Sequence, residues 1–293
     1  MSKGMGWKKD KYDKRDYLHK LLAVVPDVCI LDQWLPDVRD QGVVGSCVGH
    51  GIGANLTAWA KKLSCYSEWF SPTWIYNGAR FKEGTLMYDV GAFPRDALDW
   101  LVEKGGLLEH FWPYNPKALD TKSPPSSLEP EAAKWPVLTY YRVTNGIDGI
   151  CSALASGFFI SIGNPWFSKW MNIGEDGVLP EVTAQDLIVG GHETFLYGYN
   201  KTTQMFYGMN SWGMGWGNKG RFLMPFSTFS VFNSLGGYDA HYVEVSWAPQ
   251  PPPPKPEPEK KGLTWWQWVL IGVGGVVAIV GIILLILSLT GNL

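Results

Sequence analysis

The chain has 293 residues, of which 46% are hydrophobic and 18% are charged, and its formal net charge is −2. This length is enough for a large core in one or two domains. The near-neutral charge gives no electrostatic reason to expect a nucleic-acid partner, and the low charged fraction predicts a membrane segment or a large buried interior.

The four cysteines, Cys29, Cys47, Cys65 and Cys151, have neither metal-ligand spacing nor the density of a disulfide framework. We therefore expect reduced thiols, no metal site and no cofactor. The N-terminus contains no apolar stretch of the signal-peptide type, which agrees with a cytosolic, reducing compartment.

The first half of the chain is predicted to be mainly helical. Residues 1–26 are interpreted as an ordered lead-in arm, and residues 27–31 as a short strand. A glycine-rich loop then leads into a helix that begins at Cys47 and ends near Lys62.

Three further helical segments follow. Ser71 before Pro72 is typical of a helix start, because serine caps the first turn and proline fits its first position. Pro94 opens another helix, which Gly105 can close. A short helical turn is expected near residues 129–134.

The second half is predicted to be mainly sheet. A short helix at residues 149–156, with Asp148 as its N-cap, interrupts the β-rich sequence. This order predicts an α+β domain over 27–247, with a helical lobe (27–134), a β lobe (135–247) and a cleft between them. The β-rich runs are 137–143, 158–163, 192–199, 204–209, 221–224 and 242–247.

The C-terminal part has a different composition. Residues 248–262 are rich in proline, which predicts an extended, semi-rigid linker. Residues 263–289 carry no charged side chain, and as a helix 269–287 would span about 28 Å, close to a bilayer core of roughly 30 Å. We therefore expect a transmembrane helix at 263–289, followed by a short tail, 290–293.

The residues flanking this span predict its orientation. Lys260 and Lys261 precede it, and the positive-inside tendency then places the large domain on the cytoplasmic side of a single-pass, tail-anchored protein. Whether the anchor also oligomerises is left open. Three tryptophans mark the expected interfacial belt: Trp265, Trp266 and Trp268.

Four residues have the chemistry of covalent acyl transfer. A cysteine at a helix start, as expected for Cys47, meets a favourable macrodipole that lowers the thiol pKa. His192 near a strand start and Asn210 at a strand end can form a base and its orienting partner. Gln41, on the loop before Cys47, can join the Cys47 backbone N–H in an oxyanion hole.

Competing motifs are weaker. The dinucleotide-like glycine pattern at residues 49–54 has no apolar strand before it. His192-Glu193 does not continue into the zinc pattern H-E-x-x-H, because Leu196 holds the last place. Cys47 alone would more often be a small buried hydrophobe, so its catalytic role depends on the other three residues.

Three sequence blocks resemble the active-site blocks of the papain-like cysteine peptidases, particularly microbial members without disulfides. The resemblance covers about residues 27–246. It implies a papain-like two-lobed fold with a central helix that starts at the nucleophile. The blocks are Gln41-Gly-Val-Val-Gly-Ser-Cys47, Gly191-His192 and Asn210-Ser-Trp-Gly-Met-Gly-Trp-Gly-Asn-Lys-Gly220.

The resemblance also implies a role for each matching residue. Cys47 is the implied nucleophile, His192 the base and acid, Asn210 the orienter and Gln41 the oxyanion donor. The other implied positions concern substrate and shielding: Trp212 covers the His–Asn hydrogen bond, Gly91 pairs with an extended substrate, and Gly191 and Glu193 border the substrate.

Several positions depart from the family pattern. Val48 and His50 stand where the family usually has aromatic residues, so His50 is interpreted as structural. Glu193 replaces a small residue at the main specificity pocket, which suggests a preference for a basic substrate side chain. Only about 26 residues precede the domain, so no long inhibitory propeptide is expected, and control of activity would need another route.

These patterns favour a membrane-anchored cysteine peptidase that acts on a peptide or protein substrate. A catalytically silent, membrane-tethered peptide-binding scaffold is the alternative from another class. A transpeptidase using the same acyl-enzyme is the third possibility.

Overall fold

The computed structural model describes residues 3–14, 16–22, 24–63, 66–247 and 289. The chain divides into two units, Met1–Gln250 and Pro251–Leu293, and every element named here lies in the first. Its α-helices are α1 Cys47–Lys62, α2 Pro72–Glu83, α3 Pro94–Lys104, α4 Glu129–Ala132, α5 Gly146–Ala155 and α6 Thr228–Ser234. Its strands are β1 Val28–Ile30, β2 Val137–Arg142, β3 Ile160–Phe167, β4 Ile188–Asn200, β5 Met205–Met209, β6 Arg221–Pro225 and β7 Asp239–Val245.

The helices of the first half begin where the sequence predicts. Helix α1 starts at Cys47, and α2 starts at Pro72 with the Ser71 hydroxyl accepting the backbone N–H of Trp74 at 3.1 Å. Helix α3 starts at Pro94 and is followed by Gly105 at φ 87°. Local capping chemistry therefore defines these boundaries.

Two features of the second half differ from the prediction. Helix α5 begins at Gly146 after Asn145, which takes φ 56°, so Asp148 lies inside the first turn and the predicted cap was wrong. Helix α6 follows a turn after β6 and had not been predicted. Its seven residues bury Phe229 and Phe232, a pattern too short for a helical period to stand out.

The sheet has the order β2-β7-β3-β4-β5-β6, with β1 pairing to β4, and all of these pairs are antiparallel. Each predicted β-rich run overlaps one of these strands. Strand β4 begins at Ile188, earlier than residue 192, because Gly190 and Gly191 already pair with Trp166 and Pro165 of β3. The catalytic-type histidine therefore lies inside a long central strand.

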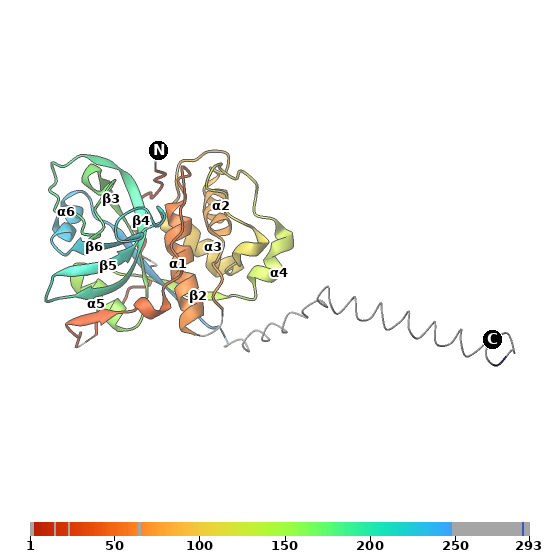
Figure 1. The fold of residues 1–293 in the computed structure, drawn as a ribbon, viewed down its shortest axis with the longest axis horizontal. Helices are drawn as coiled ribbons and strands as arrows, with labels where there is room; N and C mark the ends of the chain where they lie inside the picture. The colour runs from red at the N-terminus through yellow and green to blue at the C-terminus, as the bar shows by residue number, and fades with distance from the viewer. Residues whose placement is uncertain (1–2, 15, 23, 64–65, 248–288, 290–293) are drawn as a thin grey trace. The chain divides into compact units, whose positions relative to one another are not determined.

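Two hydrophobic cores confirm the two-lobed α+β architecture (Figure 1). One core belongs to the sheet with α5 and α6, and the other to α1, α2 and α3. Helix α1 serves both, since Ala54 and Ala58 face the sheet while Ile52 and Leu56 face the helices. Its small residues let it lie against the sheet, and its start is held by both lobes.

The predicted linker, 248–262, and the predicted transmembrane helix, 263–289, lie outside the described residues except for Leu289. Within the described part, the structure contains no helix with the length and apolar character needed to span a bilayer.

Close packing of α2 on α3 yields a stability prediction. A Cβ added at Gly78 would lie 2.3–2.4 Å from three ring atoms of the buried Trp100. We expect Gly78→Ala to lower the free energy of unfolding by about 1–3 kcal/mol, because the overpacking outweighs the gain in helix propensity. Urea unfolding of the full chain measures the change.

The matched control makes room for the added methyl group. Trp100→Leu alone should destabilise the protein, but adding Gly78→Ala to it should cost little more. An equal cost of Gly78→Ala in both backgrounds would contradict the overpacking explanation.

Candidate active site

Cys47 is the first residue of α1 and is fully buried. Backbone N–H groups of Glu193, Gly6 and Val48 lie close enough to its sulfur to lower the pKa of the thiol. The donors come from α1, from β4 and from the N-terminus, so three distant parts of the chain meet at the thiol.

His192 is held in one orientation. Its Nε2 lies 2.7 Å from Oδ1 of Asn210, and both residues are buried. An amide oxygen can only accept, so Nε2 carries the proton and Nδ1 keeps its lone pair. Nδ1 has no hydrogen-bond partner among the described residues. The ring is thus oriented with one nitrogen available as a base.

Two indole rings enclose this imidazole. Trp212 and Trp166 each have a ring centroid 4.7 Å from that of His192. The Trp212 ring is tilted by 35° and the Trp166 ring lies edge-on at 70°. The position expected for Trp212, beside the His–Asn hydrogen bond, agrees with this packing.

Gln41 presents an amide donor at the site. Its Nε2 donates to Val44 O at 2.8 Å and to Gly4 O at 3.1 Å. Its Oε1 accepts the Ser211 hydroxyl, which fixes which end of the amide faces Gly4. A peptide carbonyl of the chain itself therefore occupies the position expected for an oxyanion.

That carbonyl belongs to residues 3–10, which we call the cleft segment. Figure 1 shows the N-terminal end of the chain at the junction between the sheet and α1. The segment bonds to both lobes, so it lies between them. Its backbone bonds are Gly4 N to Gly42 O (3.1 Å), Ala92 N to Gly6 O (2.8 Å), Lys8 N to Ala92 O (3.0 Å) and Trp7 N to Gly191 O (3.1 Å).

The cleft segment forms a strand-like pairing at the residue after Gly91, the position predicted to pair with a substrate. Ala92, rather than Gly91, forms the parallel bridge with Trp7. Gly91 has φ 75°, and a Cβ there would lie 2.0 Å from Gly6 O. Gly91 therefore permits the close approach, and its neighbour makes the hydrogen bonds.

The Trp7 side chain fills a pocket on the β lobe. A Cβ at Gly163 or Gly191 would lie 2.1 or 2.6 Å from ring atoms of Trp7, so the two glycines make room for the indole. At the other end, Trp7 Nε1 donates to Asp239 Oδ2 at 3.1 Å. No motif had marked Asp239 or Trp7, because neither is near the catalytic-type residues in sequence.

Glu193 borders the same region, but its surroundings disfavour the negative charge on which the predicted preference for a basic side chain depends. Its side chain is buried, and neither carboxyl oxygen has a hydrogen-bond partner within the described part of the chain. Burial, with the nearby charges of Asp10 and Asp239, raises its pKa well above the usual value. In this closed arrangement burial disfavours the ionised form of Glu193, which is the form that would attract a basic side chain.

The thiol and imidazole are also neutral. Burial raises the pKa of Cys47 to about 12, and burial lowers the pKa of His192 to about 4. The sequence predicts a lowered thiol pKa from the helix start. The structure differs because the cleft segment and the surrounding side chains exclude water, and desolvation outweighs the helix dipole.

His50 takes the structural role expected for it. Its Nδ1 lies 3.0 Å from Ser46 O on the preceding turn, and its ring packs edge-on against Tyr114 at 4.5 Å. Through these contacts the His50 ring is held within the helical lobe.

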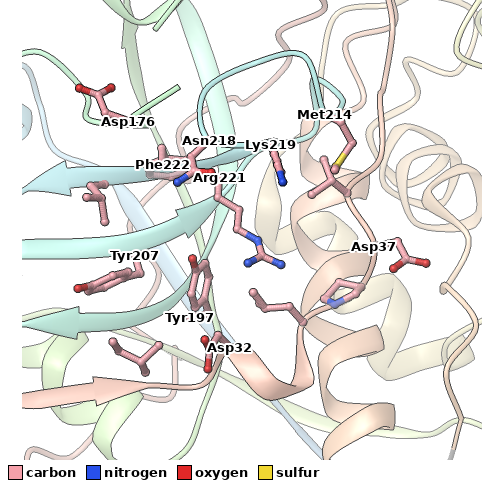
Figure 2. Close-up of a pocket in the computed structure, with 15 residues that line it drawn as sticks. Asp32, Asp37, Asp176, Tyr197, Tyr207, Met214, Asn218, Lys219, Arg221 and Phe222 are labelled. Atoms are coloured by element: carbon pink, nitrogen blue, oxygen red, sulfur yellow. The ribbon is translucent and has the colours of Figure 1, made fainter. Parts of the chain in front are cut away.

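An open pocket of about 710 Å³ lies elsewhere, between strands β1, β4, β5 and β6 and the loops at 35–38 and 214–219 (Figure 2). None of the expected site residues lines it. The lining of the pocket combines the basic side chains of Arg221 and Lys219 with several carboxylates. This mixture of charges does not indicate a class of ligand. The described residues contain no group of three or more His, Cys, Asp or Glu side chains suited to a metal ion.

Similarity searches give a consistent picture. No protein-family model matches the chain. An uncharacterised C1-like peptidase of Acanthamoeba polyphaga mimivirus is 30% identical over 259 residues, covering 77% of this chain and 82% of that protein.

Solved structures that resemble this chain are also cysteine proteases. Xylellain, a cysteine protease from Xylella fastidiosa, superposes with a TM-score of 0.75 at 26% identity, covering 84% of this chain and 97% of that one. Bromelain from Ananas comosus, at 18% identity and a TM-score of 0.56 over 76% of this chain and all of its own, shares the fold. The chain therefore belongs to the papain-like cysteine peptidases, a family of hydrolases.

Proposed function

We propose that this peptidase cleaves peptide bonds through a Cys47 acyl-enzyme, with His192 as base and acid and Asn210 as its orienter. The proposal rests on one observation above all. A peptide of the chain itself lies at Cys47: Gly4 O accepts from the Gln41 amide, and the Gly6 N–H is close enough to the sulfur to lower the pKa of the thiol. The site thus has the shape and donors needed to hold an extended peptide.

The reaction follows from these positions. His192 Nδ1 takes the thiol proton while the sulfur attacks the carbonyl carbon of the substrate. The Gln41 amide and the Cys47 backbone N–H, at a helix start, stabilise the resulting oxyanion. His192 then gives its proton to the leaving amine. Water, deprotonated by His192, cleaves the thioester and releases the acid.

Replacing the base tests this assignment against the scaffold alternative. We expect His192→Ala to lower kcat/KM for peptide cleavage by roughly a thousandfold or more, because the proposed mechanism needs this imidazole both to take the thiol proton and to protonate the leaving amine. Labelling of Cys47 by an epoxide-type thiol inhibitor, absent in Cys47→Ala, reports the nucleophile independently.

His50→Phe is the matched control, since His50 packs against Tyr114 and should be replaceable by an aromatic ring. Peptide binding without turnover or labelling in the folded wild type would favour the scaffold. Products that carry an added amine, detected by mass, would instead identify a transpeptidase.

We further propose that the cleft segment keeps the enzyme latent. The Gly6 N–H lies close enough to the Cys47 sulfur to influence the pKa of the thiol, so the segment lies over the nucleophile. The segment also covers the Gln41 amide and keeps the thiol and imidazole neutral. A substrate must therefore displace residues 3–10 before it can bind.

Weakening the segment should expose the nucleophile. We expect Trp7→Ala in the full chain to speed alkylation of Cys47 by at least about tenfold, because losing a packed indole is worth more than about 1.4 kcal/mol of docking. Quenched-flow alkylation with iodoacetamide, at one fixed pH, measures the rate.

Tyr12→Ala is the matched control, because Tyr12 lies in the same part of the chain and is 90% exposed. It should leave the rate unchanged. Equal rates in Trp7→Ala and wild type would mean that the segment does not limit access.

We also propose that residues 263–289 anchor the enzyme in a membrane, with the catalytic domain on the cytoplasmic side. The support is the uncharged apolar composition of the segment, the tryptophans at its start, and the lysines before it. Anchoring would confine the enzyme to substrates near a membrane surface.

Flotation of membranes from expressing cells checks the anchor. The full chain should float with the lipid after an alkaline carbonate wash, and a chain ending at residue 262 should not. In sealed microsomes, added protease should digest the catalytic domain. Full-length protein that remains in the soluble fraction would refute anchoring, and a protected domain would refute the orientation.

A further inference from the structure

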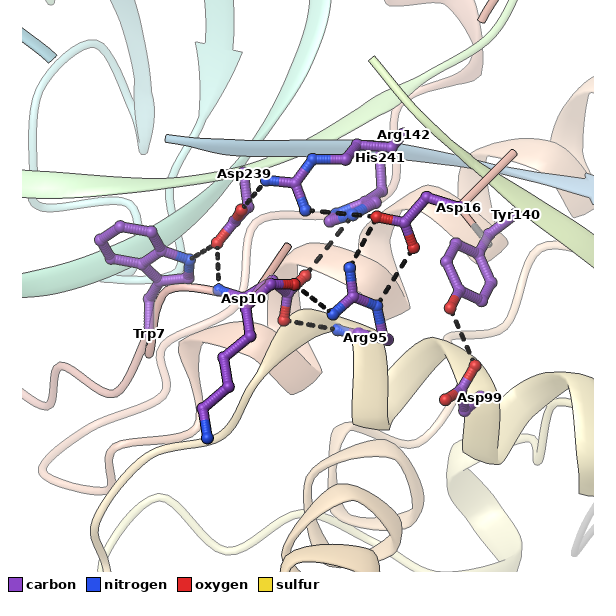
Figure 3. A network of polar contacts seen from close by, with 10 residues as sticks. Trp7, Asp10, Asp16, Arg95, Asp99, Tyr140, Arg142, Asp239 and His241 are labelled. Atoms are coloured by element: carbon purple, nitrogen blue, oxygen red, sulfur yellow. Dashed lines mark hydrogen bonds and ion pairs between the residues drawn. The ribbon is translucent and has the colours of Figure 1, made fainter. Parts of the chain in front are cut away.

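The cleft segment is fastened by a buried carboxyl cluster (Figure 3). Two of its groups, Trp7 Nε1 and Asp10 N, donate to the same oxygen, Asp239 Oδ2, at 3.1 and 2.8 Å. Asp239 is fully buried and Asp10 is 5% exposed. The attachment therefore brings a carboxyl of the segment next to a carboxylate of the β lobe.

Two guanidinium groups reach this cluster, and both are engaged by other carboxylates. Arg142 Nη2, from β2, lies 2.6 Å from Asp239 Oδ1. Arg95, from α3, binds both oxygens of Asp16 at 2.7 and 3.2 Å. Asp16 and Asp239 thus balance the two cations, and an ionised Asp10 would add an uncompensated charge.

The surroundings of Asp10 offer little else to stabilise a negative charge. Its Oδ1 accepts the backbone N–H of Arg95 at 3.2 Å. Its Oδ2 lies 3.5 Å from His241 Nε2 and has no hydrogen-bond partner among the described residues. Burial lowers the pKa of His241 well below its usual value, so this imidazole is neutral.

The remaining titratable neighbours do not change this balance. Glu193, from β4, is buried without a partner in the described chain, and its pKa is raised by burial and by the charges of Asp10 and Asp239. Tyr140, from β2, already donates its hydroxyl to Asp99 of α3 at 2.9 Å. Burial and the charge of Asp239 together raise the pKa of Asp10 to about 7.

We infer that Asp10 is a proton-dependent latch that holds the cleft segment over Cys47 while it is protonated and releases the segment when it ionises. This inference rests on the proposed latency of the enzyme. It predicts a peptidase that opens as the pH rises, and the docked segment is the form favoured in acid.

The direction follows from linkage. In a released segment Asp10 is exposed to water, with an ordinary pKa of about 4. The docked form keeps its proton up to about pH 7. Docking is therefore strongest below roughly pH 4 and weakens about tenfold per pH unit until roughly pH 7, above which it changes no further. Water entering the cleft would ionise Glu193 in the same direction.

Hydrogen exchange tests the latch without relying on catalysis. The protein is the detergent-solubilised full chain with Cys47→Ser, which prevents self-cleavage. The amides of Gly4, Trp7, Lys8 and Asp10 are followed by mass spectrometry between pH 5 and 8, corrected for intrinsic exchange. Protection should fall about tenfold per unit up to pH 7 and then level off.

Asp10→Asn is the decisive variant, because the amide keeps the shape of the protonated carboxyl and cannot ionise. It should stay docked across the range, with no slope. Asp27→Asn, an exposed carboxyl before β1, is the matched control and should keep the wild-type slope. In the Cys47-containing enzyme, Asp10→Asn should slow alkylation at pH 8 relative to wild type.

Each outcome decides the question. Protection equal at pH 5 and pH 8, an unchanged slope in Asp10→Asn, or loss of docking in Asp10→Asn at every pH would each overturn the latch. If the slope is present but Cys47 and His192 prove unreactive, the latch stands and the proposed chemistry fails. If peptide cleavage is found but hydrogen exchange shows no slope with pH, the proposed chemistry stands and the latch fails.

Discussion

Exclusion of water from the Cys47 sulfur governs the state of this active site. A cysteine at a helix start is favoured as a thiolate only while the charge is solvated or paired. Here the cleft segment covers it, and burial raises the pKa of the thiol to about 12 and lowers that of His192 to about 4. The proton therefore stays on sulfur. In the proposed mechanism the same groups exchange it once water and substrate replace the segment.

The fold makes this covering possible through backbone contacts that need no side chains. Gly6 and Gly91 touch so closely that a Cβ on Gly91 would lie 2.0 Å from Gly6 O. Gly191, which has no Cβ, similarly leaves room for Trp7. Glycine at these positions lets a peptide approach both lobes within hydrogen-bonding distance. In the proposed binding mode a substrate makes the same approach, so the segment and the substrate would compete for one surface.

Local signals predicted much of the fold and of the site. The Ser71 cap and the prolines at 72 and 94 define helix starts because their effects act within one turn. The histidine and asparagine were placed by motif and do lie within hydrogen-bonding distance. The roles of Trp7, Ala92 and Asp239 escaped prediction because they arise from pairing between segments more than 80 residues apart, and no period or motif in the sequence records such contacts.

The residues left without partners distinguish a peptidase from a silent scaffold more sharply than the motifs do. Burying a polar atom without a hydrogen bond costs stability, so a protein that only bound peptides would gain by filling such positions. In the described chain, His192 Nδ1 and both Glu193 oxygens are buried without hydrogen-bond partners. Asn210 meanwhile holds the imidazole so that its lone pair remains unused. An imidazole kept oriented with a free lone pair is what proton transfer requires, and peptide binding alone does not require it.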